Sequence, residues 1–251
     1  MSSETNSGSN GRPKNRPTNR QAAVPKVRTI LTASDLSKSY GDRPALEPLS
    51  IDVLPGQRVA LIGHNGSGKT TLMKMAAGLL SPSTGSITID GAPAGSETAR
   101  RALSWLSDTP VFYDDLSLWE HLQYVAGMHD VADWEDRANG LLDRVGLTHR
   151  KDDLPLTFSR GLRQKAAITL ALIRPFKLLL VDEPFVGLDA NGKRALLELF
   201  ALAATEGATQ VVATHELSFV EQSDRLIALR DGVSVWDGPP AEADLHALVQ
   251  P

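Results

Sequence analysis

The chain has 251 residues and a mass of 27.0 kDa, which is enough for one large domain or two small ones. Its apolar fraction of 41% is that of a folded protein, and no apolar run approaches the roughly 18 residues needed to cross a bilayer. Because cysteine is absent, disulfides and thiol chemistry are excluded, and the composition fits a cytoplasmic protein.

Charge is unevenly distributed along the chain. Residues 1–28 carry six basic side chains and one acidic one, whereas the remaining residues carry 20 basic and 29 acidic ones. The acidic remainder argues against DNA or RNA as a partner, because phosphate neutralisation needs clustered Lys and Arg. Residues 1–28 are rich in Ser, Asn, Pro and Gly, so we predict a disordered basic leader without a signal peptide. We interpret it as a solubilising tail, with contact to anionic lipid or nucleic acid as the alternative.

After the leader, strand and helix patterns alternate. Short apolar runs bounded by turn residues predict strands at 29–36, 49–53, 58–62, 86–90, 178–181, 210–213 and 226–229, with a turn-rich segment at 39–48. Apolar spacing of three and four residues predicts helices at 70–80, 118–128, 134–145, 162–173, 192–205 and 219–223. The alternation predicts an α/β fold with a mainly parallel sheet, interrupted between 96 and 156 by a helical insertion.

One glycine-rich stretch lies between a predicted strand and a predicted helix, and it reads Gly63-His64-Asn65-Gly66-Ser67-Gly68-Lys69-Thr70. The spacing matches a phosphate-binding loop, in which glycines let backbone N–H groups converge on phosphate oxygens and the following helix adds its positive dipole end. We predict that Lys69 reaches the β- and γ-phosphates of ATP, that the Thr70 hydroxyl holds Mg²⁺, and that Thr71 contacts the α-phosphate. An ordinary glycine-rich turn is the alternative, and the strand–loop–helix context argues against it.

Two carboxylates, Asp182 and Glu183, follow the apolar run at 178–181. At the carboxyl end of a parallel strand they would lie beside the phosphate-binding loop, where ligands bind in such folds. Asp182 is suited to orient Mg²⁺, and Glu183 is suited to polarise the water that attacks the γ-phosphorus in line. The alternative, a solvated acidic strand end, would be preferred only if the glycine-rich loop were absent.

With these residues in place, the chain over roughly 29–238 resembles the ATP-binding subunits of ABC transporters. Six features occur in that family's order: an aromatic residue that stacks on adenine, the phosphate-binding loop, a glutamine loop, a signature motif, the acidic strand with the loop after it, and a switch histidine. They correspond here to Tyr40, residues 63–70, Asp108 within 107–110, Ser159 and Gly161 within 158–165, residues 178–184 with Asp189, and His215. Taken alone, Tyr40 would be a packing residue and His215 a structural one; their positions in this order favour the nucleotide roles.

The resemblance implies a P-loop NTPase core at 29–240 with a mainly parallel sheet, a small antiparallel β subdomain and an inserted α-helical subdomain at about 96–165. It is followed by a C-terminal tail at 241–251. The resemblance also implies a homodimer or heterodimer of nucleotide-binding subunits in which the phosphate-binding loop of one subunit and the signature motif of the other enclose ATP and Mg²⁺. The dimer would act at the cytoplasmic face of the membrane beneath a separate integral membrane subunit, which selects the cargo. Trp105, Phe112, Tyr113 and Trp119 would line the groove for that subunit or, equally, pack inside the helical subdomain.

This sequence departs from the family pattern at three positions. Arg160 replaces a small residue of the signature motif, and Leu162 replaces its glutamine. The Ser-Arg-Gly form resembles a variant found in exporters, so we expect export. Asp108 stands in place of the glutamine that senses the metal; a carboxylate can coordinate Mg²⁺ but, when ionised, donates no hydrogen bond.

Two other functions are alternatives to transport. A non-transport ATPase of the same superfamily, acting on DNA or ribosomes, would be expected to carry coiled-coil arms, zinc modules or two ATPase units. A small-molecule kinase built on a phosphate-binding loop would leave the signature-like segment and His215 unexplained. We therefore predict an ATP-hydrolysing transport subunit with no metal other than Mg²⁺.

Overall fold

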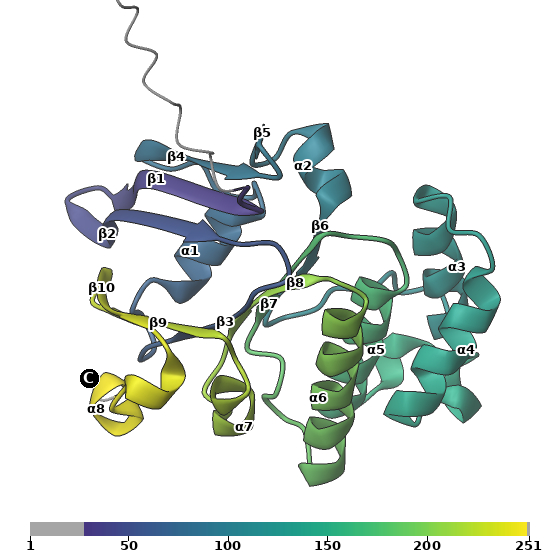
Figure 1. Cartoon of the computed structure of the whole chain (residues 1–251). Helices are drawn as coiled ribbons and strands as arrows, with labels where there is room; N and C mark the ends of the chain where they lie inside the picture. Colours follow the sequence, from purple (N-terminus) through teal and green to yellow (C-terminus); the bar gives the residue numbers. More distant parts are fainter. Residues whose placement is uncertain (1–27, 250–251) are drawn as a thin grey trace, which may run out of the picture.

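The structure is a computed structural model that describes residues 28–249. The prediction of a disordered leader lies outside these residues except at Arg28, whose Nη2 lies 3.2 Å from Asp90 Oδ1. Two sheets organise the described chain, as Figure 1 shows. The smaller, antiparallel sheet has the order β2-β1-β4-β5 and is made of β1 (Leu31–Tyr40), β2 (Arg43–Val53), β4 (Thr84–Ile89) and β5 (Ala92–Pro93).

The larger sheet is mainly parallel and has the order β10-β9-β3-β8-β7-β6. Its parallel strands are β3 (Arg58–Ile62), β6 (Leu103–Leu106), β7 (Leu178–Asp182), β8 (Thr209–Ala213) and β9 (Arg225–Arg230), and β10 (Val233–Gly238) runs antiparallel to β9. The helices are α1 (Lys69–Ala76), α2 (Glu97–Ala102), α3 (Leu118–Met128), α4 (Trp134–Val145), α5 (Arg160–Leu172), α6 (Ala190–Thr205), α7 (Leu217–Glu221) and α8 (Leu245–Val249). Both the parallel sheet and the antiparallel β subdomain were predicted.

Apolar side chains cover both faces of the larger sheet. In β7, Leu178 and Leu180 pack with α1 and the small sheet, whereas Leu179 and Val181 pack with α5 and α6, since successive side chains of a strand point to opposite faces. Figure 1 shows the corresponding layers, with α1 between the two sheets and α6 and α7 on the opposite side of the large one. A strand buried on both faces is continuously apolar, which is why 178–181 was predicted correctly.

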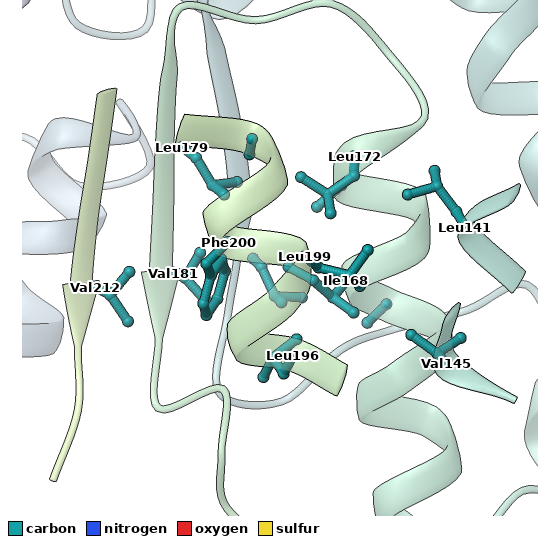
Figure 2. Packing of buried hydrophobic residues seen from close by; sticks show 14 of the residues in the cluster. Leu141, Val145, Ile168, Leu172, Leu179, Val181, Leu196, Leu199, Phe200 and Val212 are labelled. Carbon is teal, nitrogen blue, oxygen red and sulfur yellow. The ribbon is translucent and has the colours of Figure 1, made fainter. Parts of the chain in front are cut away.

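The core that joins the sheet to the helical subdomain is centred on Phe200 of α6. Figure 2 shows this ring between the strand residue Val181 and Leu199 of its own helix, with Ile168 beyond Leu199 and Val212 on the far side of Val181. Phe200 is fully buried, and its ring meets those of two further phenylalanines with centroids 5.5–5.9 Å apart in edge-to-face geometry. The core therefore holds α5 and α6 at a fixed position relative to the strand ends that carry the predicted site.

Helix ends in the helical subdomain follow local sequence signals. The predicted helices at 118–128 and 134–145 match α3 and α4 to the residue. At the start of α3, Ser117 and Glu120 form a capping box, with each side chain bonded to the other's backbone N–H. At the end of α4, Gly146 has a φ of 72°, the left-handed conformation that commonly ends a helix.

Several elements differ from the sequence-based prediction. The segment 39–48, predicted as turn-rich, belongs mostly to a long hairpin whose turn is confined to Gly41 and Asp42. The strand β6 lies within 96–156, where only helices were predicted. Its sequence gives a weak strand signal because Ser104 is polar, yet in the structure Ser104 is buried and its hydroxyl donates to Ala171 O. The edge strand β10, with alternating exposure, and the short elements β5, α2 and α8 were not predicted. The predicted tail contains α8, whose Leu245 and Leu248 pack on the main core.

Among residues 28–249, no helix combines the length and the apolar character that crossing a membrane requires.

Candidate nucleotide-binding site

The phosphate-binding loop connects the end of β3 to the start of α1. Gly63 and Gly68 have φ values of 147° and 103°, which side chains disfavour. A Cβ at Gly63 would overlap Leu229 O, and one at Gly68 would lie 2.7 Å from Ala45 O. Only glycine fits at both positions, so the loop is held tightly against β9 and β2.

Lys69 is the first residue of α1, and its side chain folds back under the loop. Its Nζ donates to Gly63 O at 2.5 Å and to His64 O at 3.3 Å, and the side chain is buried. Burial lowers the pKa of Lys69, while the nearby carboxylates of Glu183 and Asp182 partly offset this. A buried ammonium group under a glycine-rich loop at the start of a helix is suited to bind phosphate oxygens.

Thr70 and Asp182 meet across the site, as predicted for a metal-binding pair. The Thr70 hydroxyl donates to Asp182 Oδ2 at 2.7 Å, while Asp182 Oδ1 is buried without a hydrogen-bond partner among the described residues. Burial raises the pKa of Asp182 despite the Thr70 hydrogen bond, and the charges of Asp108 and Glu183 raise it further.

The Thr70 hydroxyl and Asp182 Oδ1 suit a Mg²⁺ ion that is also bound by substrate phosphates and water, rather than a metal ion held by protein side chains alone. No group of three or more His, Cys, Asp or Glu side chains within 28–249 is arranged to hold a metal ion. Mg²⁺ is usually bound through one or two protein ligands together with substrate phosphates and water. The unpartnered Oδ1 of Asp182 and the Thr70 hydroxyl supply that number of ligands.

Glu183 and His215 are brought together from the ends of neighbouring strands β7 and β8. His215 Nε2 lies 3.2 Å from Glu183 Oε1. Glu183 has a φ of 48°, a conformation uncommon for a residue with a side chain, and its N–H donates to Ala213 O at 2.8 Å. Such strain is found preferentially at functional sites, and here it turns the carboxylate toward the phosphate-binding loop.

Most of these groups line one cavity of about 240 Å³. Its walls consist of Ala45, Asn65, Gly66, Ser67, Gly68, Lys69, Thr70, Thr71, Asp108, Asp182 and Glu183. Eight of these residues come from the loop and the carboxylates that the sequence predicted, and Asp108 and Thr71 were predicted individually. One cationic side chain therefore faces three carboxylates in a space that suits a polyphosphate with a divalent cation.

Four predicted residues lie outside this cavity and belong neither to the loop nor to the Glu183–His215 pair. Tyr40 stands at the end of β1, 56% exposed, with Lys38 Nζ 5.4 Å from its ring centre. Ser159 caps α5 by accepting from Leu162 N–H, and Asp189 caps α6 by accepting from Gly192 N–H at 2.7 Å. At Gly161 a Cβ would lie 2.8 Å from Gly187 O, so the start of α5 packs on the loop that leads to Asp189. The roles of these residues toward nucleotide stay predictions.

The turn between β9 and β10 supports the phosphate-binding loop and was not predicted. Gly232 N–H donates to Ser67 O at 3.1 Å, and Asp231 Oδ1 lies 3.3 Å from His64 Nε2. Asp231 and Gly232 both have positive φ, as in a two-residue hairpin turn, and an Asp-Gly pair between apolar runs is a known signal for one. Ala45, which also lines the cavity, could not be predicted from the sequence, because its carbonyl oxygen comes close to Gly68 only through the tertiary fold.

Comparison with known proteins identifies what this arrangement resembles. A family model described as "ABC transporter" matches residues 46–186. The uncharacterized ABC transporter ATP-binding protein YdbJ of Bacillus subtilis (strain 168) is 39% identical over 208 residues, which are 81% of this chain and 67% of that protein. The SkfA peptide export ATP-binding protein SkfE of the same organism is 35% identical over 83% of this chain and 88% of its own. Both export and import subunits occur among the matched proteins.

A solved structure described as the ATP binding subunit of an ABC transporter has a TM-score of 0.81 at 35% identity. The similarity covers 88% of this chain and 98% of that one.

Proposed function

The chain belongs to the ABC transporter family of ATP-binding proteins, and we propose from this premise that it binds and hydrolyses ATP to drive a separate transmembrane subunit. The observation that carries the proposal is the cavity lined by Lys69, by the Thr70–Asp182 pair and by Glu183, whose carboxylate lies 3.2 Å from His215 Nε2. A phosphate-binding loop alone would support binding. The strained carboxylate with its histidine partner supports hydrolysis in addition.

The residues have distinct roles in this proposal. Lys69 and the loop N–H groups hold the β- and γ-phosphates, and Thr70 and Asp182 would hold Mg²⁺, which neutralises charge on the phosphates. Glu183 accepts a proton from the attacking water as it forms a bond to the γ-phosphorus, and the bond to the bridging oxygen of ADP breaks. His215, at hydrogen-bond distance from Glu183, orients that carboxylate and contacts the γ-phosphate.

We assign the remaining predicted residues to a second subunit's site. Ser159, Gly161 and Asp189 lie outside the cavity of their own chain. The start of α5, with the Ser159 hydroxyl and the Gly161 N–H, suits an anion, and Asp189 follows the loop that packs against this helix start. In a dimer, ATP binding would bring the phosphate-binding loop of one subunit and the start of α5 of the other together around the nucleotide, and hydrolysis would let the two subunits separate. Tyr40 remains the candidate for stacking on adenine.

The transmembrane partner is assigned to a groove between the sheet and the helical subdomain. A cavity of about 600 Å³ there is lined by Trp105 and by the exposed side chains of Leu79 and Met128. Of the aromatic residues predicted to line such a groove, Trp119 instead packs on Trp134 at 4.9 Å, inside the helical subdomain. Binding there would place the chain at the cytoplasmic face of a membrane. The Ser-Arg-Gly form of the signature motif and the export role named for SkfE support export.

The test is Mg²⁺-dependent ATP hydrolysis by the purified protein, with and without its membrane subunit. Glu183→Gln should retain ATP binding, lose hydrolysis and accumulate an ATP-bound dimer, and Lys69→Ala should lose ATP binding. Glu198→Gln, the same change at an exposed position of α6, is the matched control and should behave like the parent. Hydrolysis at the parent rate by Glu183→Gln would show that another group is the catalytic base.

A further inference from the structure

The segment 107–117 joins β6 to α3 and forms part of two cavities. At its start, Asp108 lines the cavity of the phosphate-binding loop. Three residues further on, Val111 and its neighbours line a second cavity of about 320 Å³, shared with α3 and α5. The position of this one segment therefore affects the nucleotide site and the boundary of the helical subdomain together.

A buried histidine of α3 holds the segment. His121 is 4% exposed, and its Nε2 accepts from the backbone N–H of Tyr113 at 2.9 Å. Its Nδ1 lies 2.8 Å from Ser117 O. Because an N–H donates and a carbonyl accepts, these two contacts require a neutral ring with its proton on Nδ1.

Aromatic contacts fix the same ring. The Phe112 ring meets His121 edge to face with centroids 5.5 Å apart, and the Tyr113 ring stacks on it at 5.9 Å. Tyr124, one turn further along α3, contacts Tyr113 in turn at 5.7 Å. The middle of the segment is exposed, with Val111 at 90%.

Few other bonds hold the segment. Within the part of the chain that the structure describes, the Tyr113 N–H is the one backbone group of residues 110–116 that is hydrogen-bonded to another element. Loss of that bond would leave a segment with few restraints, free to move Asp108 relative to Asp182 and Glu183.

We propose that His121 is a positioning residue for ATP hydrolysis, which keeps Asp108 in the nucleotide cavity by binding the Tyr113 N–H. The inference rests on the proposed ATPase function, because it concerns the rate of that reaction. The proposed function assigns ATP binding mainly to residues 63–71, and among the described residues no backbone hydrogen bond joins that stretch to 107–117. Asp108 faces the carboxylates where hydrolysis takes place. Release of the segment should therefore lower kcat and leave KM unchanged.

The test compares two substitutions of His121 with a matched control. His121→Phe keeps a flat ring but removes the acceptor, and we expect kcat to fall roughly tenfold with KM within about twofold, as for one released hydrogen bond. His121→Gln restores an acceptor oxygen at similar reach and should recover most of the rate. His149→Phe makes the same chemical change at an exposed histidine and should leave both constants unaltered.

Amide hydrogen exchange in the protein without nucleotide gives a second measurement that does not depend on activity. In the parent, the Tyr113 amide should exchange more slowly than the others in 110–116, and in His121→Phe it should exchange at least roughly tenfold faster. Fast exchange of this amide in the parent would overturn the inference even if His121→Phe did not fold. Equal loss of kcat in His121→Gln and His121→Phe, or none in either, would overturn it as well. A parent without ATPase activity would refute the proposed function instead, and exchange would still report on the hydrogen bond.

Discussion

Replacing Asp182 by Asn should make the metal-free protein more stable while it removes ATP hydrolysis. Asp182 is 1% exposed, its Oδ1 has no hydrogen-bond partner among the described residues, and Asp108 and Glu183 place further negative charge nearby. Among residues 28–249, Lys69 is the one cation whose charge lowers the pKa of Asp182. Burying this ionised carboxylate therefore lowers the free energy of unfolding of the metal-free protein, and bound Mg²⁺ would offset that loss.

The magnitude follows from what the amide of the variant keeps and what it loses. Its oxygen can still accept from Thr70, while the negative charge disappears and one N–H₂ group is left without a partner. An unpartnered buried polar group costs about 1–3 kcal/mol, and an unpartnered charge costs more, so we expect a net gain of about 1 kcal/mol. In a chain of this size, that raises Tm by about 2–4 °C.

The stability that Asp182→Asn gains over the parent should increase with pH. Burial raises the pKa of Asp182 in the folded protein above the usual value of about 3.9 in the unfolded chain. The unfolded chain therefore loses this proton first, and the parent loses stability as pH rises from about 4 through the folded pKa. The Asp182→Asn variant would carry no such dependence, so the stability difference between variant and parent should be small near pH 4 and largest at neutral pH.

The assay is thermal or urea unfolding in EDTA at several pH values, together with Mg²⁺-dependent ATP hydrolysis. Removing one group that stabilises developing charge typically lowers kcat by roughly 10²- to 10³-fold, and we expect a loss of that size. Excess Mg²⁺ with ATP should stabilise the parent more than the variant. A variant that is less stable than the parent in EDTA at neutral pH would refute the electrostatic reasoning. Hydrolysis at the parent rate would refute the assignment of Asp182 as a metal ligand.

Three further changes test the loop, the core and a helix start. Gly63→Ala should weaken ATP binding at least roughly tenfold, since its Cβ would overlap Leu229 O and displace the loop, and titration with a fluorescent ATP analogue measures this. Phe200→Ala should lower the free energy of unfolding by about 3–5 kcal/mol, because it opens a cavity in the core of Figure 2; a loss below about 1 kcal/mol in urea unfolding would contradict the packing argument. Ser117→Ala removes one half of the capping box with Glu120 and should cost about 1 kcal/mol in the same measurement, with no change in ATP affinity.

Elements with a local physical cause could be predicted from the sequence. The strand at 178–181 is apolar at every position because both faces are buried, and α4 ends at Gly146 because glycine adopts the left-handed conformation there. The phosphate-binding loop was also predicted, since its chemistry depends on glycine backbone geometry and on adjacent residues. In the same way, Asp182 and Glu183 were placed beside the loop from their position after a buried strand.

Tertiary structure decided the features that depend on contacts between distant residues. The strand β6 is recognisable only in the fold, where the buried Ser104 hydroxyl finds a partner on α5. The distance between Glu183 and His215 depends on β7 lying next to β8, and the hydrogen bond between His121 and Tyr113 depends on how the segment after β6 folds back on α3. Residue types and their spacing determine which local conformations and which chemistry are available to this chain. Which of those groups meet depends on strand order and core packing, because these alone set the distances between residues far apart in the sequence.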